Sequence, residues 1–366
     1  MKEEEKVIET DFDTAAEDSS EDSFSSYESE FKDIDITDTP FSLFEYLRQL
    51  SKGKVIIQPD FQRNQVWNNG QKSKFIESII LNYPLPPIYL NETKEAKYTV
   101  IDGLQRTSSI NQFYNNEFAL EKLQALTKYN GYRFSELPEY IRSKFEDKKL
   151  TIFILKPSTP MVIIYDLFNR INTGGTQLNR QEVRNCIFIG KSTLLLRELS
   201  EQPYFKKAIW WGIRDTRMKD REVILRYLAF RWFDFINEYS GDMSMYIESA
   251  MQRINRIEEN KIELMKYDFK RVMELTFEIW GQRNFRIPTE QTRGTVNTAI
   301  LESVCNFVSY KTDDFILSNI SVIRENYTLL ISNSIYYEAV TKSTGSKSKV
   351  LERFRIANQI LSANTI

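Results

Sequence analysis

The segment KYTVIDGLQRTSSI, residues 97–110, is the stretch around which the rest of the chain is organised. Its first part, Tyr98 to Ile101, is rich in β-branched and aromatic residues and predicts a short buried strand. Asp102 and Gly103 interrupt that strand, and apolar residues return at helical spacing from Leu104 to Tyr114. The segment therefore predicts a strand that passes through a tight turn directly into a helix.

The turn contains a carboxylate, a glycine, an amide and a guanidinium: Asp102, Gly103, Gln105 and Arg106. Phosphate oxygens suit both the free N–H groups of a helix start and the planar fork of an arginine. The glycine would let the backbone approach an anion closely, and Asp102 is able to hold hydrated Mg²⁺ or orient a water. The same residues also allow a structural turn, in which Asp102 pairs with Arg106 and Gly103 only makes the bend.

Histidine is absent from the 366 residues, and its absence excludes several classes of chemistry. Ser-His-Asp and Cys-His catalysis, histidine-ligated zinc and histidine-metal nuclease sites all require it. Cys186 and Cys305 each lie in an apolar helical pattern and are predicted to be reduced core residues. Any reaction here therefore depends on carboxylates, arginines, lysines, amides and a hard cation such as Mg²⁺.

Charge is distributed unevenly along the chain, with a net of −12 in residues 1–39 and +10 in the remainder. The N-terminal stretch is rich in Glu, Asp and Ser and poor in aliphatic residues, so we predict a disordered acidic arm. A basic body with an acidic arm suits a protein that meets polyanions such as DNA, although a solubilising tail would have the same composition. Without a long apolar run or a basic signal sequence, the chain is expected to be cytoplasmic and away from membranes.

The rest of the chain predicts an α/β half followed by an all-α half. Thr39 and Pro40 have the pattern of an N-cap and a first helical residue, and residues 179–362 show helical periodicity nearly throughout. Further strands are predicted at Lys54–Ile57, Ile88–Leu90 and Leu150–Leu155. We therefore predict two domains, residues 40–178 and residues 179–366.

Four motifs, taken in order, are similar to a known family: IIQPDFQRNQVW, FIESIILNYPLPPIYL, YTVIDGLQRTSSI and FNRINTGGTQLNRQEVRNC. The series resembles the N-terminal domain family of GmrSD-type restriction endonucleases, which is placed in the ParB/sulfiredoxin-like superfamily. The resemblance covers roughly residues 40–190. It implies an α+β protein, with a ParB/sulfiredoxin-like mixed α/β domain followed by an all-α domain.

The signature turn of that family, D-G-Q-Q-R, stands here as DGLQR at residues 102–106, with Leu104 in place of the first glutamine. In the family this turn is associated with nucleotide binding and with hydrolysis that licenses DNA cleavage. The resemblance therefore implies a nucleoside triphosphate and Mg²⁺ as ligands. It implies that Gln105 and Arg106 contact phosphate or activate water, and that Asp102 organises the metal or the turn.

Two other polar segments are implied to contribute to the nucleotide site. Gln62 and Arg63 match the family's Q-R pair after the first strand and would approach the same pocket. The second segment is Asn172, Thr173, Gly174 and Gly175. Its backbone N–H groups suit a concave anion nest, but a glycine turn that only ends a helix has the same residues.

A basic and aromatic cluster in the helical half suggests contact with DNA. Trp210 and Trp211 precede Arg214, Arg217 and Lys219. Aromatic rings next to cations can stack bases and follow phosphates. The alternative is a set of ordinary surface ion pairs with little energetic consequence.

Many full-length relatives also carry a C-terminal nuclease domain whose motif depends on histidine. Because this chain has no histidine, the resemblance implies that any DNA cleavage is done by a partner nuclease subunit or by the ParB-like pocket itself. The leading hypothesis is a nucleotide-binding, Mg²⁺-dependent NTP-hydrolysing component of a DNA restriction or phage-defence system that engages DNA. A non-enzymatic DNA-binding sensor or specificity module and a stand-alone ParB-like nuclease are the alternatives, and each is compatible with a homo-oligomer.

Overall fold

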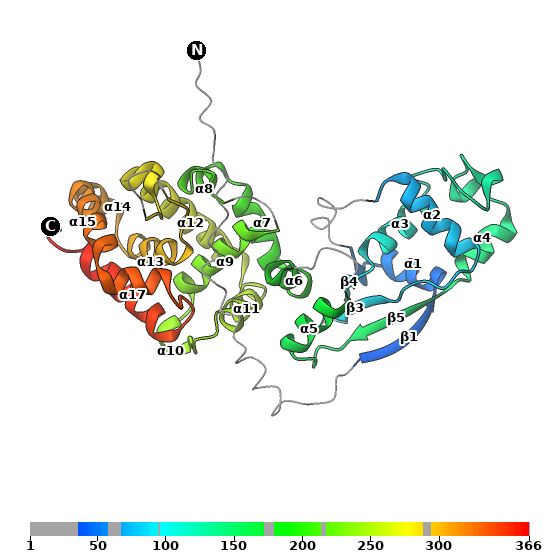
Figure 1. Ribbon diagram of the computed structural model, residues 1–366, viewed down its shortest axis with the longest axis horizontal. Coiled ribbons are helices and arrows are strands. Elements are labelled where there is room, and N and C mark those ends of the chain that lie inside the picture. The colour runs from blue at the N-terminus through cyan, green and yellow to red at the C-terminus, as the bar shows by residue number, and fades with distance from the viewer. Residues whose placement is uncertain are drawn as a thin grey trace, which may run out of the picture. The chain divides into compact units, whose positions relative to one another are not determined.

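The computed structural model describes residues 36–57, 67–93, 96–171, 179–213, 217–287 and 294–365. This part of the chain divides into two compact units, with the boundary between Ile187 and Phe188. A mixed α/β unit with one five-stranded sheet comes first, and a helical unit follows (Figure 1). The predicted fold class is therefore confirmed. The predicted acidic arm lies outside the described residues as far as residue 35.

The first unit is built on a sheet with the strand order β1-β5-β3-β4-β2. The strands are β1 Ile36–Ser42, β2 Val55–Ile56, β3 Ile88–Glu92, β4 Tyr98–Asp102 and β5 Lys149–Leu155. The pairs β1/β5 and β3/β4 are antiparallel, whereas β3/β5 and β2/β4 are parallel. The strand that leads to the Asp102 turn therefore has a hydrogen-bonded neighbour on each side.

Helices cover both faces of this sheet (Figure 1). They are α1 Leu43–Ser51, α2 Asn69–Ile80, α3 Leu104–Tyr114, α4 Glu139–Glu146, α5 Met161–Ile171 and α6 Arg180–Ile187. Successive residues of a strand face opposite sides, and β4 shows this directly. Val100 packs in the core with Phe113 of α3, whereas Ile101 packs with Ile164 of α5 and Val183 of α6. Both faces of the central strand are thus buried.

The predicted helix start at Thr39 and Pro40 is wrong, because these residues lie in β1 and the folded unit begins before residue 40. β1 pairs with β5 along its whole length, from Ile36 to Ser42. A proline is tolerated there because β1 is an edge strand, where an N–H group is not needed on the open side. The first helix begins three residues later than predicted, with Ser42 as its N-cap: the hydroxyl accepts from the N–H of Glu45 at 3.1 Å.

The two units divide after Ile187 rather than at the predicted domain boundary after residue 178. The intervening helix α6 is part of the first unit, because its Val183 packs against β4 and β5 of the sheet. The predicted capping box at its start is confirmed. Asn179 N–H donates to Glu182 Oε2 at 2.7 Å, and Glu182 N–H donates to Asn179 Oδ1 at 2.8 Å.

Helices make up the second unit throughout the part of it that the structure describes, apart from one β-bridge between Arg286 and Val296. They are α7 Lys191–Glu201, α8 Pro203–Ala208, α9 Lys219–Trp232, α10 Phe235–Glu238, α11 Met243–Ile254, α12 Glu259–Trp280, α13 Thr298–Ser309, α14 Asp313–Ser318, α15 Ile320–Ser332, α16 Ser334–Thr341 and α17 Lys347–Leu361. Helix α13 is buried along most of its length and contacts α9, α12, α16 and α17. It forms the centre of this unit, and the predicted helical half is confirmed.

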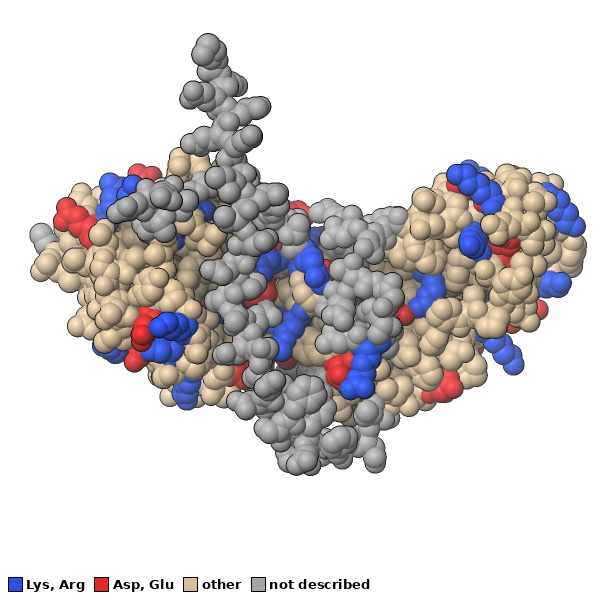
Figure 2. Space-filling view, in the orientation of Figure 1, with Lys and Arg blue, Asp and Glu red and all other residues tan. Residues whose placement is uncertain are grey.

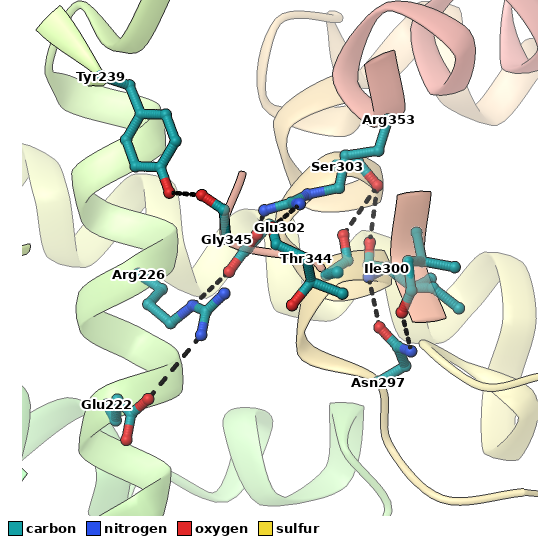
Figure 3. Close-up of polar contacts among 12 residues, drawn as sticks. Glu222, Arg226, Tyr239, Asn297, Ile300, Glu302, Ser303, Thr344, Gly345 and Arg353 are labelled. Atoms are coloured by element: carbon teal, nitrogen blue, oxygen red, sulfur yellow. Dashed lines mark hydrogen bonds and ion pairs between the residues drawn. The ribbon is translucent and has the colours of Figure 1, made fainter. Parts of the chain in front are cut away.

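A buried ion network fixes α13 between two other helices (Figure 3). Arg226 of α9 donates through Nε to Glu302 Oε1 at 2.5 Å, and Arg353 of α17 donates through Nη2 to Glu302 Oε2. Arg226 also lies 3.9 Å from Glu222, and Arg353 donates to the carbonyl oxygen of Thr344 at 2.5 Å. Three helices that are distant in the sequence are joined by a single carboxylate.

Both cysteines, Cys186 and Cys305, are free and buried, as predicted. Burial raises the pKa of each thiol, so neither is an activated nucleophile. Among the described helices, none combines the length and the apolar character that crossing a bilayer requires.

Candidate functional site

The predicted strand-turn-helix is present: β4 ends at Asp102, and α3 begins directly after Gly103. Gly103 is the N-cap of α3, with a left-handed φ of 92°. A Cβ here would lie 3.1 Å from Ile88 Cγ1 and 3.2 Å from Arg106 Nη2, so both the backbone and the available space favour glycine. Among the described residues, no side chain caps the first N–H groups of α3.

Arg106 ties this turn to the segment that leads into β3. Its Nη2 donates to Asp102 Oδ2 at 2.5 Å, and its Nη1 donates to the carbonyl oxygens of Pro86 and, at 3.0 Å, Pro87. The Arg106 side chain is 11% exposed and that of Asp102 is 26% exposed. The ion pair that the structural interpretation of the turn expects is therefore formed, and the guanidinium is largely committed to contacts within the protein.

Gln105 uses only part of its hydrogen-bonding capacity. Its Oε1 accepts from the N–H of Trp67 at 3.2 Å, and the Trp67 ring packs edge-on against Phe75 with centroids 5.5 Å apart. Within the described residues no hydrogen bond is formed by the Gln105 side-chain nitrogen. This NH₂ group is the part of the side chain that can contact a ligand.

A tyrosine that the sequence analysis did not single out lies beside the turn. Tyr89 of β3 is the register partner of Asp102, and its ring stacks on Phe153 of β5 at 5.2 Å between centroids. Burial and then the charge of Asp102 raise the pKa of Tyr89, while Arg106 lowers it. Antiparallel pairing of the two predicted strands was the signal that could have revealed it, but the register is not readable from their residues alone.

The carboxylates near the turn limit how a metal ion could be held. Across the ranges that the structure covers, no group of three or more acidic or cysteine side chains is arranged to bind a metal. Asp102 engages Arg106 through Oδ2. A Mg²⁺ ion bound at Asp102 would therefore have one protein carboxylate as a ligand. Water molecules and phosphate oxygens would supply its other ligands.

Several predicted site residues lie outside the described part of the chain. They are Gln62, Arg63, Asn172, Thr173, Gly174, Gly175 and Arg214. The structure therefore brings together Asp102, Gly103, Gln105 and Arg106, and the other nucleotide-site residues stay predictions.

Arg217 and Lys219 are the predicted DNA-binding residues of the helical unit that the structure describes. Arg217 is exposed, and Lys219 lies 3.3 Å from Glu222 Oε2. On the face shown in Figure 2, the visible lysine and arginine side chains are interspersed with aspartate and glutamate. This part of the prediction stays untested, and the surface-ion-pair alternative accounts for Lys219.

A cavity of about 500 Å³ lies in the α/β unit away from the Asp102 turn. Its walls come from α1, the end of β2 and the last turn of α3, and they include Phe44, Leu47, Arg48, Asn111 and Tyr114. The Asp102 turn lies at the opposite end of α3. The cavity is not predictable from the sequence, because it forms where three separate segments meet.

Residues 43–189 match the family described as GmrSD restriction endonuclease, N-terminal domain. This part of the chain is therefore similar to GmrSD-type N-terminal domains. The resemblance predicted from the four motifs is confirmed, and the matched residues span α1 to α6 and four of the five strands. Searches of curated proteins and of solved structures gave no match.

Proposed function

We propose that this protein is the nucleotide-binding component of a DNA restriction or phage-defence system, and that the Asp102–Arg106 turn binds the phosphates of a nucleoside triphosphate. One observation carries the proposal. Helix α3 starts at a left-handed glycine with its first N–H groups uncapped, next to a carboxylate, an amide and a guanidinium. Such a helix start is a ready anion site. The match of residues 43–189 to a restriction endonuclease domain supports the wider role.

Each residue of the turn has a different part in this proposal. The N–H groups of α3 and the NH₂ group of Gln105 contact the phosphates, because neither has a side-chain acceptor within the described ranges. Arg106 acts mainly as a positioning residue that holds Asp102 and the turn in place. Asp102 is the candidate ligand of Mg²⁺, which when bound neutralises phosphate charge and so favours hydrolysis.

DNA engagement and a nuclease partner belong to the same proposal. The family is described as a restriction endonuclease, and this chain contains no histidine with which to build the usual histidine-dependent nuclease site. We therefore assign cleavage to a partner subunit. Arg217 and Lys219 are the described candidates for phosphate contact in the helical unit, through charge alone.

A second candidate function is a non-enzymatic DNA-binding module. The ion pair between Asp102 and Arg106 favours it, because the two charged groups of the turn already neutralise each other. In that case DNA binding would need no nucleotide. Its affinity would fall steeply with salt, with a log-log slope of about −0.9 for each phosphate contacted.

The experiment is direct binding of labelled ATP, GTP, CTP and UTP to the full chain with Mg²⁺. We expect one of them to bind, and Gln105→Ala to weaken that binding about tenfold through loss of one contact to a charged group. Gln124→Ala, which changes an exposed glutamine of the same unit, is the matched control. Failure of all four nucleotides to bind would overturn the nucleotide proposal and leave the DNA-binding module.

A further inference from the structure

Two adjacent tryptophans form the turn that ends α8. The N–H of Trp211 donates to the carbonyl oxygen of Lys206 at 2.9 Å, and the N–H of Trp210 donates to that of Lys207 at 2.9 Å. These nested bonds close the helix end in the manner of a Schellman motif. Both tryptophans have left-handed backbone, with φ of 47° at Trp210 and 51° at Trp211. Glycine normally takes such positions, because a Cβ atom is strained there.

The two indole rings have different environments. Trp210 stacks on Phe277 of α12 with centroids 5.9 Å apart and planes at 8°, and Lys207 Nζ lies 4.6 Å from the centroid of the same Phe277 ring. Trp211 meets Trp210 only edge-on and is 62% exposed. Trp210 therefore anchors the turn, and Trp211 presents its ring to solvent.

Buried polar groups hold this turn from the inside. Arg286, which is 1% exposed, donates through Nη2 to the carbonyl oxygen of Ile209 at 2.6 Å. Asn284 donates through Nδ2 to the carbonyl oxygen of Ala208 at 3.1 Å. A Cβ at Gly212 would lie only 2.3 Å from Arg286 Nη2, so the backbone fits closely over the guanidinium. The surrounding structure thus holds this left-handed pair of tryptophans in one conformation.

Within the described residues 203–213 and 217–219, the charged side chains are all basic. They belong to Lys206, Lys207, Arg217 and Lys219. Lys219 is paired with Glu222 of its own helix. A polyanion is the partner whose charge complements this segment, and an exposed indole face is what an unstacked base needs.

We propose that Trp211 is a stacking platform for an unpaired base of single-stranded DNA, with Lys206 and Lys207 contacting the flanking phosphates. This inference rests on the DNA engagement in the proposed function and names the form of DNA. Base pairs in an intact duplex hide their faces in the stack, so the contact requires a strand that is already open. The strain at Trp211 is maintained because the left-handed turn holds the ring away from the protein surface.

The test compares the full-length protein with Trp211→Ala and Trp211→Phe, using a labelled oligothymidylate and a duplex of equal length. Loss of one stacked base should weaken single-strand binding about 5-fold or more in Trp211→Ala, and less in Trp211→Phe. Duplex binding should change little in both variants. Tyr267→Ala, at an aromatic residue of α12 that is 67% exposed, is the matched control and should bind like wild type.

The Trp211→Gly variant distinguishes loss of the stacking ring from loss of folding stability. Because glycine suits the left-handed turn, this variant should melt about 2–4 °C above Trp211→Ala, and it should bind single strands as weakly. Unchanged single-strand binding in Trp211→Ala, or an equal loss on duplex, would overturn the stacking role alone. Wild-type protein that binds neither form of DNA would overturn both this inference and the DNA engagement on which it rests.

Discussion

Glu302 and Arg353 form an ion pair in which neither side chain is exposed to solvent, at the centre of the helical unit (Figure 3). Taking both charges out of water is costly, so such a pair depends on the further partners that each group has. Glu302 serves a second arginine, Arg226, and Arg353 also donates to the carbonyl oxygen of Thr344. Removing one member therefore leaves more than one buried charge or donor without its partner.

Glu302→Gln should accordingly lower the free energy of unfolding by about 3–5 kcal/mol, the range for breaking a buried pair. Urea unfolding followed by circular dichroism measures this change. The matched control is Lys342→Ala, which removes an exposed ion pair with Glu338 and should cost less than ~1 kcal/mol. Similar losses in the two variants would contradict a structural role for the buried network.

Alanine substitutions at Gly53 and Gly103 distinguish the stability cost of backbone strain from the cost of insufficient space for a Cβ atom. Both are left-handed, with φ of 92° and 64°, but only at Gly103 would a Cβ meet neighbours, at 3.1 Å from Ile88. We expect Gly53→Ala to cost about 1–2 kcal/mol through its backbone alone. Gly103→Ala should cost about 1–3 kcal/mol more, because the turn must also make room. Urea unfolding measures both variants, and equal costs would show that space at the Asp102 turn is not limiting.

The sequence predicted the strand from Tyr98 to Ile101 from its β-branched and aromatic residues, and the helix from Leu104 to Tyr114 from its apolar spacing. A glycine between them marked the turn. It failed at β1, where Thr39-Pro40 looked like a helix start. That pattern is local, whereas β1 forms through pairing with β5, which lies over a hundred residues later. Long-range strand pairing overrides a local capping signal, and one sequence does not contain the information to predict it.

At the candidate site, too, the local features are predictable from the sequence and the long-range contacts are not. The sequence placed Asp102, Gly103 and Arg106 in one turn, because they are neighbours in the chain. It could not predict that Arg106 donates to the carbonyl oxygens of Pro86 and Pro87, since that contact depends on how β3 and β4 are aligned. Hydrogen-bond acceptors from distant parts of the sequence determine whether an arginine stabilises the fold or is available to bind a ligand.

Tyr204 makes the helical unit sensitive to high pH. Burial, followed by the negative charges of Glu198 and Glu274, raises its pKa from 10.0 to about 12, and Lys266 lowers it. The folded state holds this proton more tightly, so the stabilisation is complete below pH 10 and is lost as the pH rises towards 12. Tyr204→Phe should lose less stability over this interval than wild type. Urea unfolding across the interval measures the effect, and Tyr267→Phe, at an exposed tyrosine of α12, is the control and should behave like wild type.

Asp102→Asn and Arg106→Ala distinguish the two parts of the ion pair at the turn. Asp102→Asn removes a partly exposed pair and leaves the contacts of Arg106 with Pro86 and Pro87, so it should cost about 1 kcal/mol or less. Arg106→Ala leaves the Asp102 carboxylate and two carbonyl oxygens without their donor and should cost about 2–4 kcal/mol. Thermal unfolding gives the order of the two. Under the proposed function, Asp102→Asn additionally removes the Mg²⁺ dependence of nucleotide binding; an Asp102→Asn variant that is less stable than Arg106→Ala would contradict the positioning role of the arginine.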